Sequence, residues 1–165
     1  MSETRFWLLL ALAGALQTPQ PKYLPPPPVQ PIPFSHRQHL TQGLDCINCH
    51  ELPEPGDFAG LPSTTRCMSC HLEIKKESPF IQRLAEWHKE GKPVPWKRVY
   101  RIPDYVFFSH KEHLGKGGAV CQDCHGPVRE RDILRKEKET SMAACMDCHR
   151  ARNASLACDY CHEKR

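Results

Sequence analysis

The sequence predicts a mainly irregular chain with short α-helices, whose interior is filled largely by something other than its own side chains. Only 39% of the 165 residues are of hydrophobic type, so a core made of side chains alone would be small. Sixteen prolines and nine glycines limit long helices and strands. Ten cysteines are far more than an ordinary globular chain of this length contains, and their spacing indicates what fills the interior.

All ten cysteines belong to one repeated motif, C-x-x-C-H, and none is left over. The copies begin at Cys46, Cys67, Cys121, Cys145 and Cys158, and we call them the first to fifth sites. Two thiols three positions apart can add to the vinyl groups of one haem, and the next histidine then binds the iron as proximal ligand. The alternatives are zinc sites, which do not require a histidine after every second cysteine, and five disulfides. The repeated motif favours five covalently bound haem c groups over both.

The motif gives a predicted role to fifteen residues. The haem-attaching cysteines are Cys46, Cys49, Cys67, Cys70, Cys121, Cys124, Cys145, Cys148, Cys158 and Cys161. The proximal iron ligands are His50, His71, His125, His149 and His162. Because so many haems in so short a chain must lie close together, we expect the haems themselves to form the core.

Five further histidines lie outside the motifs. Four of them belong to two copies of F-S-H-x-x-H-L, which begin at Phe34 and Phe108. In each copy the two histidines are three positions apart, on one face of a helical turn, and can reach two neighbouring haems. We therefore predict four distal iron ligands: His36, His39, His110 and His113.

The fifth distal ligand has two candidates. Met142 precedes the fourth motif, and a thioether is an axial donor that raises the potential of a haem relative to imidazole. Ordinary packing against a porphyrin would also explain Met142. His88 stands alone in a polar stretch, where a histidine more often simply faces solvent. We favour Met142, with His88 as the alternative.

The chain divides into three parts. Residues 1–16 include a short apolar run and a small-residue cleavage pattern, which indicate a secretory signal peptide or an uncleaved N-terminal anchor. Residues 17–33 are rich in proline and are expected to form an extended linker. Residues 34–165 form the pentahaem domain. It contains two modules that each have one F-S-H-x-x-H-L segment and two motifs, residues 34–75 and 108–150, and the fifth site at 158–162.

Helical spacing of apolar residues predicts a helix over residues 79–90, which the glycine and prolines of residues 91–95 would end. Residues 128–139 are predicted to form a charged, solvated helix, and residues 141–149 a short helix that carries the fourth site. The run 105–108 is the one candidate strand, and it would equally pack on a haem.

The region from Phe34 to His162 resembles the class III multihaem cytochromes c, and more narrowly the pentahaem subunit of alternative complex III and related membrane oxidoreductases. The resemblance rests on the two F-S-H-x-x-H segments and on the stretches 93–99, 102–110, 124–128 and 142–150. It implies mostly bis-histidine haems, allows one His/Met haem, and implies partners that are iron–sulfur or quinone-oxidising subunits or other cytochromes. The chain departs from the family at Tyr100, where related sequences often have histidine.

We expect an exported, periplasmic electron-transfer protein, held at the membrane by an anchor or by partners as part of a quinol-oxidising respiratory or photosynthetic complex. The alternatives are a soluble periplasmic shuttle and a multihaem reductase with one open haem. We expect no enzyme activity, no small-molecule substrate and no nucleic-acid binding. Although the formal charge is +4, five haems would add about ten propionates, and Lys97, Arg98 and Arg101 are predicted to pair with these.

Overall fold

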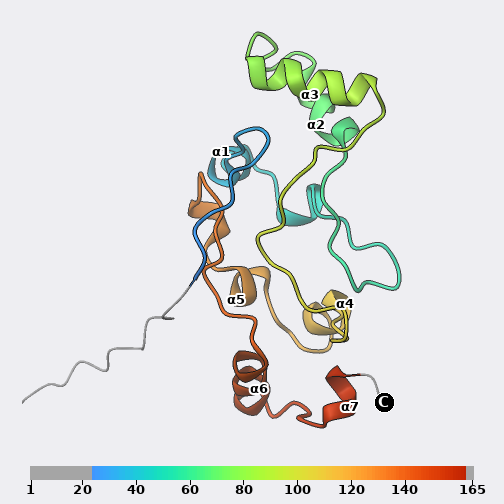
Figure 1. Cartoon of the computed structure of the whole chain (residues 1–165), viewed down its shortest axis with the longest axis vertical. Helices are drawn as coiled ribbons and strands as arrows, with labels where there is room; N and C mark the ends of the chain where they lie inside the picture. The colour runs from blue at the N-terminus through green and yellow to red at the C-terminus, as the bar shows by residue number, and fades with distance from the viewer. Residues whose placement is uncertain (1–23, 163–165) are drawn as a thin grey trace, which may run out of the picture.

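The structure is a computed structural model, and it describes residues 24–162. The signal peptide or anchor predicted over residues 1–16 lies outside the described residues, as does the first part of the proline-rich segment. The chain forms an elongated domain of short helices joined by irregular stretches (Figure 1). Between residues 24 and 162 no strand forms, and a single β-bridge pairs Val106 with His162. The predicted fold class is confirmed.

The helices follow the motifs. In chain order they are α1 (His36–Leu40), η1 (Cys46–Asn48), α2 (Thr64–His71), α3 (Pro79–Lys89), α4 (His110–Leu114), α5 (Cys121–His125), η2 (Val128–Glu130), α6 (Met142–Ala151) and α7 (Cys158–Cys161). The five motifs lie on η1, α2, α5, α6 and α7, and the F-S-H-x-x-H segments form α1 and α4. Helices α2 and α3 lie at one end of the long axis, and α6 and α7 at the other (Figure 1). No helix among the described residues is both long and apolar enough to cross a membrane.

Serine residues set where four of the helices begin. Ser35 and Ser109, the serines of the two F-S-H segments, accept a hydrogen bond from the backbone N–H three residues ahead. Ser63 and Ser141 do the same at the start of α2 and α6. The serine of each F-S-H segment therefore makes the next histidine the first residue of a helix.

Two of the three predicted helices are confirmed, as α3 and α6. Helix α3 ends just before Gly91, as expected from the sequence. Gly91 has a positive φ of 66°, which a glycine adopts easily. Its N–H donates to His88 O at 3.0 Å, and Lys92 N–H donates to Trp87 O at 2.8 Å. This pair of bonds is a Schellman ending, which uses carbonyls that the helix leaves without partners.

The helix predicted over residues 128–139 is wrong. Only Val128–Glu130 forms a single turn, η2, and the stretch that follows is irregular. Not all of its charges face solvent, because Arg131 pairs with Glu137, whose side chain is only 15% exposed. Tyr100 Oη accepts the backbone N–H of Glu137 at 2.9 Å and of Lys138 at 3.3 Å. These contacts hold the irregular segment against the domain.

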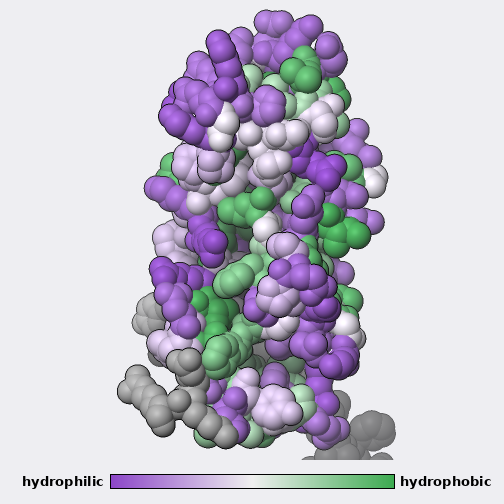
Figure 2. All heavy atoms as spheres, turned by 90° about the vertical axis from the view of Figure 1, so that its right-hand side faces the viewer, coloured by the Kyte–Doolittle hydropathy of each residue, from purple (hydrophilic) through white to green (hydrophobic). Residues whose placement is uncertain are grey.

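The apolar core is small and lies between α2 and α3. Its buried side chains are Ile32, Met68, Leu84, Trp87 and Val94. Only Met68 belongs to a haem motif, and the structure buries no large apolar side chain at the other four motifs. Apolar side chains instead reach the surface along the molecule, as one face shows (Figure 2). Such a chain needs bound groups to complete its interior.

The end of the proline-rich segment packs against the domain. Ile32 is buried in the core. Gln30 exchanges two hydrogen bonds with the backbone of Lys97, at 2.8 Å to its carbonyl and 3.0 Å from its N–H. The segment that connects the two modules is therefore hydrogen-bonded to residues that precede the first module.

Each module also holds the histidine helix of the other. At α1, Arg37 N–H donates to Arg131 O at 3.0 Å, and Ser35 Oγ donates to Asp132 Oδ1 at 2.6 Å. Arg37 and Asp132 also form an ion pair. Residues of the second module therefore fix the helix that carries the distal histidines of the first.

The reverse contact fixes α4. Lys111 N–H donates to Gly56 O at 3.0 Å, and the Lys111 ammonium pairs with Glu54 at 2.7 Å. His110 Nδ1 lies 2.8 Å from Asp57 O, within hydrogen-bonding distance. A loop of the first module thus positions the distal histidines of the second.

Candidate haem-binding sites

In the first module, each histidine of α1 faces the histidine of one motif. The ring centres of His36 and His50 lie 6.4 Å apart, and those of His39 and His71 lie 6.1 Å apart. The two histidines of one short helix thus reach two different sites.

The second module repeats the arrangement. The ring centres of His113 and His149 lie 6.1 Å apart. At the third site, burial lowers the pKa of His125, and the nearby charges of His110 and His50 lower it further, so His110 lies in the surroundings of His125. The structure therefore sets predicted distal and proximal histidines face to face at three sites, and at the third site it places His110 near His125.

The separations fit an iron atom between each pair. A histidine nitrogen binds a metal at about 2 Å, and the ring centre lies roughly 1 Å beyond that nitrogen, so two imidazoles on opposite sides of one iron have centres about 6 Å apart. The measured values run from 6.1 to 6.4 Å. Together with two motif cysteines at each site, these residues fit a covalently bound haem.

Seven histidines hold their Nδ1 atom near a backbone carbonyl. The pairs are His39 with Ser35 (2.7 Å), His50 with Gly60 (2.8 Å), His71 with Ile74 (2.9 Å), His110 with Asp57 (2.8 Å), His113 with Ser109 (2.7 Å), His149 with Ser155 (2.6 Å) and His162 with Tyr105 (3.4 Å). Because a carbonyl only accepts, Nδ1 carries the proton and Nε2 keeps its lone pair. This is the usual second contact of a metal-binding histidine.

Two of the paired histidines lack such a carbonyl. His36 Nδ1 is buried and has no hydrogen-bond partner among the described residues. Burial, and then the charges of His50 and His39, lower the pKa of His36 to about 4, so its ring is neutral at neutral pH. The ring of His125 meets the ring of Tyr100 edge-on, with centres 4.6 Å apart and planes at 79°.

Cysteines of neighbouring motifs show how the first three sites adjoin. Partial desolvation raises the pKa of Cys67, and the nearby Cys49 raises it further, so the second site adjoins the first. Partial desolvation also raises the pKa of Cys121, with added effects of the charge of Cys46 and of a hydrogen bond between the two thiols. The first motifs of the two modules thus meet at the centre of the molecule.

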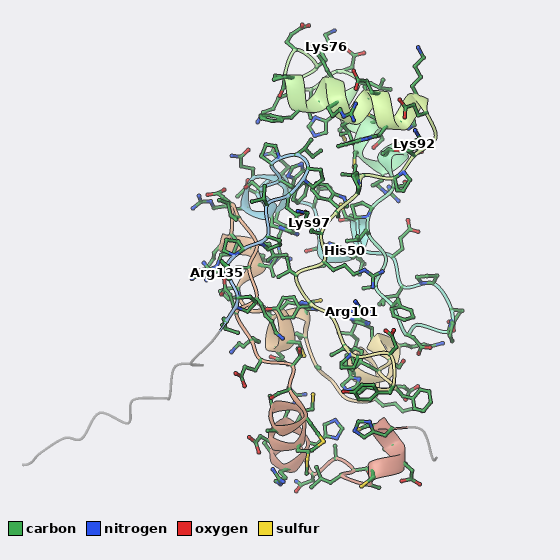
Figure 3. All side chains as sticks on the ribbon, viewed as in Figure 1. His50, Lys76, Lys92, Lys97, Arg101 and Arg135 are labelled. Carbon is green, nitrogen blue, oxygen red and sulfur yellow. The ribbon has the colours of Figure 1, made fainter. Side chains whose placement is uncertain are left out.

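The remaining sites continue the line. Partial desolvation and then the nearby Cys148 raise the pKa of Cys124, and desolvation and then Cys161 raise the pKa of Cys145. The motifs therefore lie in the order second, first, third, fourth, fifth. In Figure 1, α2 lies at one end of the long axis, α5 in the middle part, and α6 and α7 together at the other end. His50 lies near the middle (Figure 3).

The fifth site has no facing histidine in the described part of the chain. His88 belongs to α3, at the opposite end of the molecule from α7, and its Nδ1 lies 3.4 Å from Thr64 Oγ1. Met142 begins α6, which adjoins α7, and is 67% exposed. The structure thus brings the helix of Met142 to the fifth site and keeps that of His88 away from it.

The basic residues predicted to pair with propionates follow one another along the connection between the modules. Arg101 lies 3.6 Å from the carboxylate of Asp104, and Lys97 binds Gln30 through its backbone, which leaves the ammonium out of that contact. Lys97 and Arg101 lie in the middle part of the molecule (Figure 3). Their pairing with propionates stays a prediction, as does that of Arg98.

Sequence reasoning missed the residues that hold the imidazoles. The partners of the histidine Nδ1 atoms are backbone carbonyls, which every residue type has, so the sequence does not reveal them. The contact of Tyr100 with His125 joins residues 25 positions apart. The departure from the family at Tyr100 was the one available signal. The capping serines could have been predicted from their place before the helical turn.

Comparison with known proteins gives two family matches and one close relative. The class III cytochrome c family model matches residues 15–94, and the model for cytochrome c7 and related cytochromes c matches residues 106–163. The "Menaquinone reductase, multiheme cytochrome c subunit" of Nitratidesulfovibrio vulgaris, strain Hildenborough, is 37% identical over 161 residues, covering 81% of this chain and 77% of the relative. The chain therefore belongs to the class III multihaem cytochromes c, electron-transfer proteins that bind haem c covalently.

Proposed function

We propose that the chain carries five haem c groups and conducts electrons along them as a subunit of a membrane quinone oxidoreductase. Three facing pairs of histidines, at motifs whose cysteines adjoin one another, are the observation that carries this proposal. Bound haem supplies a one-electron couple. Five such sites along one elongated domain suit transport between its two ends.

Each site has a proposed set of axial ligands. They are His50 and His36 at the first site, His71 and His39 at the second, His125 and His110 at the third, His149 and His113 at the fourth, and His162 and Met142 at the fifth. The Nδ1–carbonyl contacts support these sets, because they orient imidazoles and raise their strength as ligands. Ligation on both sides of every iron leaves no position for a substrate, which supports a carrier and not an enzyme.

We prefer Met142 to His88 at the fifth site because of where their helices lie. Met142 is three residues before Cys145, on the same face of α6, and Cys145 adjoins Cys161 of the fifth motif. Helix α3, which carries His88, packs on α2 beside the second site, whose His71 already faces His39. A thioether ligand would give the fifth haem the highest potential of the series.

The name of the relative bears on the partner. The family resemblance implied a quinol-oxidising complex, whereas the relative is named as a subunit of a menaquinone reductase. We therefore propose that this chain delivers electrons to a membrane partner that reduces quinone, and that the quinone site belongs to the partner. Export to the periplasm, either with an anchor or through such partners, follows from this assignment.

Haem content and association test the proposal. Protein purified from membranes should show five haems per chain by haem absorbance against protein mass, with low-spin spectra that carbon monoxide does not shift. A variant with both Cys158→Ser and Cys161→Ser should show four. Bare polypeptide or bound zinc would overturn the haem assignment. Release of the chain by a salt wash, without copurifying subunits, would instead favour the soluble shuttle.

A further inference from the structure

The third site differs from the others in what touches its proximal histidine. His50, His71, His149 and His162 each hold Nδ1 near a backbone carbonyl. His125 has no such contact among the described residues, and the ring of Tyr100 lies edge-on to it with centres 4.6 Å apart. An imidazole N–H that faces an aromatic ring can form at most a weak hydrogen bond to the π face of that ring.

The position of Tyr100 is closely determined. Its hydroxyl accepts the backbone N–H of Glu137 at 2.9 Å and donates to His125 O at 3.3 Å. The ammonium of Lys136 lies 5.9 Å from the centre of the tyrosine ring, on its face. The ion pair between Arg131 and Glu137 fixes the segment from which these groups come. The tyrosine ring is therefore held from several sides against the imidazole.

We propose that Tyr100 is a positioning residue for the third site, which holds the His125 ring while keeping stronger hydrogen-bond acceptors away from it. This rests on the proposed axial ligands. A hydrogen bond from Nδ1–H to an acceptor makes imidazole a stronger donor to iron, and a stronger donor stabilises the ferric state. The third haem, with one carbonyl-bonded ligand, therefore has a higher midpoint potential than the fourth, where His113 and His149 both have carbonyls.

The experiment compares Tyr100→Leu and Tyr100→Phe with the wild-type holoprotein in redox titrations followed by EPR. The low-spin signals that His110→Ala and His113→Ala remove identify the third and fourth haems. Tyr100→Leu opens the space beside His125 to water, which accepts from Nδ1–H. At a fixed ambient potential the ratio of reduced to oxidised third haem should fall about tenfold, equivalent to about 59 mV for one electron. Tyr100→Phe keeps the ring and should retain the wild-type value.

Tyr105→Leu is the matched control. Tyr105 also lies against a proximal histidine, with its ring centre 6.0 Å from that of His162, but it is the Tyr105 backbone carbonyl that lies near His162 Nδ1. Its replacement should leave the third-site midpoint unchanged. The proposal is overturned if the third haem lies below the fourth in wild type, if Tyr100→Leu does not lower it, or if Tyr100→Phe lowers it equally. If His110→Ala removes no low-spin signal, the ligand assignment of the proposed function has failed instead.

Discussion

His36 and His50 face each other with ring centres 6.4 Å apart and ring planes only 8° from parallel. His36 comes from the helix capped by Ser35, and the Nδ1 of His50 lies 2.8 Å from the carbonyl of Gly60. One imidazole is thus positioned by a helix start and the other by a loop. An iron between them would draw together two segments that share no regular secondary structure.

Replacing His36 should therefore expose one iron. We expect His36→Ala to convert one haem of the five from low spin to high spin, because His36 is the described residue whose ring faces His50. Carbon monoxide should then shift part of the Soret band, measured on the purified holoprotein. His88→Ala is the control and should leave the spectrum low-spin, since α3 lies beside a site that already has two histidines. A spectrum unchanged by His36→Ala would contradict the pairing.

Met142→Leu tests the fifth site. Leucine has a volume close to that of methionine, so packing should change little while the thioether donor is lost. One haem should become high-spin, and the highest midpoint of the redox titration should disappear. Met146→Leu makes the same chemical change within the fourth motif and should have no such effect. If Met142→Leu leaves all haems low-spin and His88→Ala produces a high-spin haem, the fifth ligand is His88.

The candidate ligands could be predicted from sequence because haem attachment imposes a strict local spacing. The unit from Cys46 to His50 spans five positions, and its haem-attaching role can be recognised without knowing the fold. The predicted helices α3 and α6 were likewise set by local signals. Which distal histidine faces which motif depends on the path of loops between them, and the motif spacing does not encode that path.

The error over residues 128–139 has the same origin. Its alternating charges resemble a solvated helix, but their partners are distant: Arg129 pairs with Asp45, 84 positions away, and Arg37 binds Asp132 across 95 positions. The hydroxyl oxygen of Tyr100 accepts hydrogen bonds from two backbone N–H groups of this segment. These long-range contacts outweigh helix propensity, which is a weak local preference.

The contact between the modules predicts unequal effects of two equivalent serines. Ser35 and Ser109 both cap a histidine helix, but only Ser35 also donates to Asp132, at 2.6 Å. Ser109→Ala should lower the free energy of unfolding by about 1 kcal/mol, typical for a lost cap. Ser35→Ala should cost about 2 kcal/mol, because a hydrogen bond to a charged group is lost as well. Denaturant titration of the holoproteins measures both.

A double-mutant cycle separates the two effects at Ser35. In a background with Asp132→Ala, the cost of Ser35→Ala should fall to that of Ser109→Ala, since only the cap remains to be lost. Equal costs of the two serine variants in the wild-type background would show that the link between Ser35 and Asp132 does not stabilise the fold.

The ion pair between Arg131 and Glu137 predicts how stability responds to acid. The hydrogen bond from Arg131 holds the pKa of Glu137 below its ordinary value of 4.5. Its contribution is therefore complete above about pH 4.5 and is lost as pH falls through the lowered pKa. Glu137→Gln should lower the free energy of unfolding by about 1–3 kcal/mol near neutral pH, with a difference from wild type that shrinks in acid.

Glu130→Gln is the control for this prediction. It alters a neighbouring carboxylate that also lies near Arg131, at 3.5 Å, but is 72% exposed. It should show little difference at any pH, because an exposed pair contributes little. A Glu137→Gln deficit that stays constant from neutral to acid pH would assign the effect to packing and not to charge.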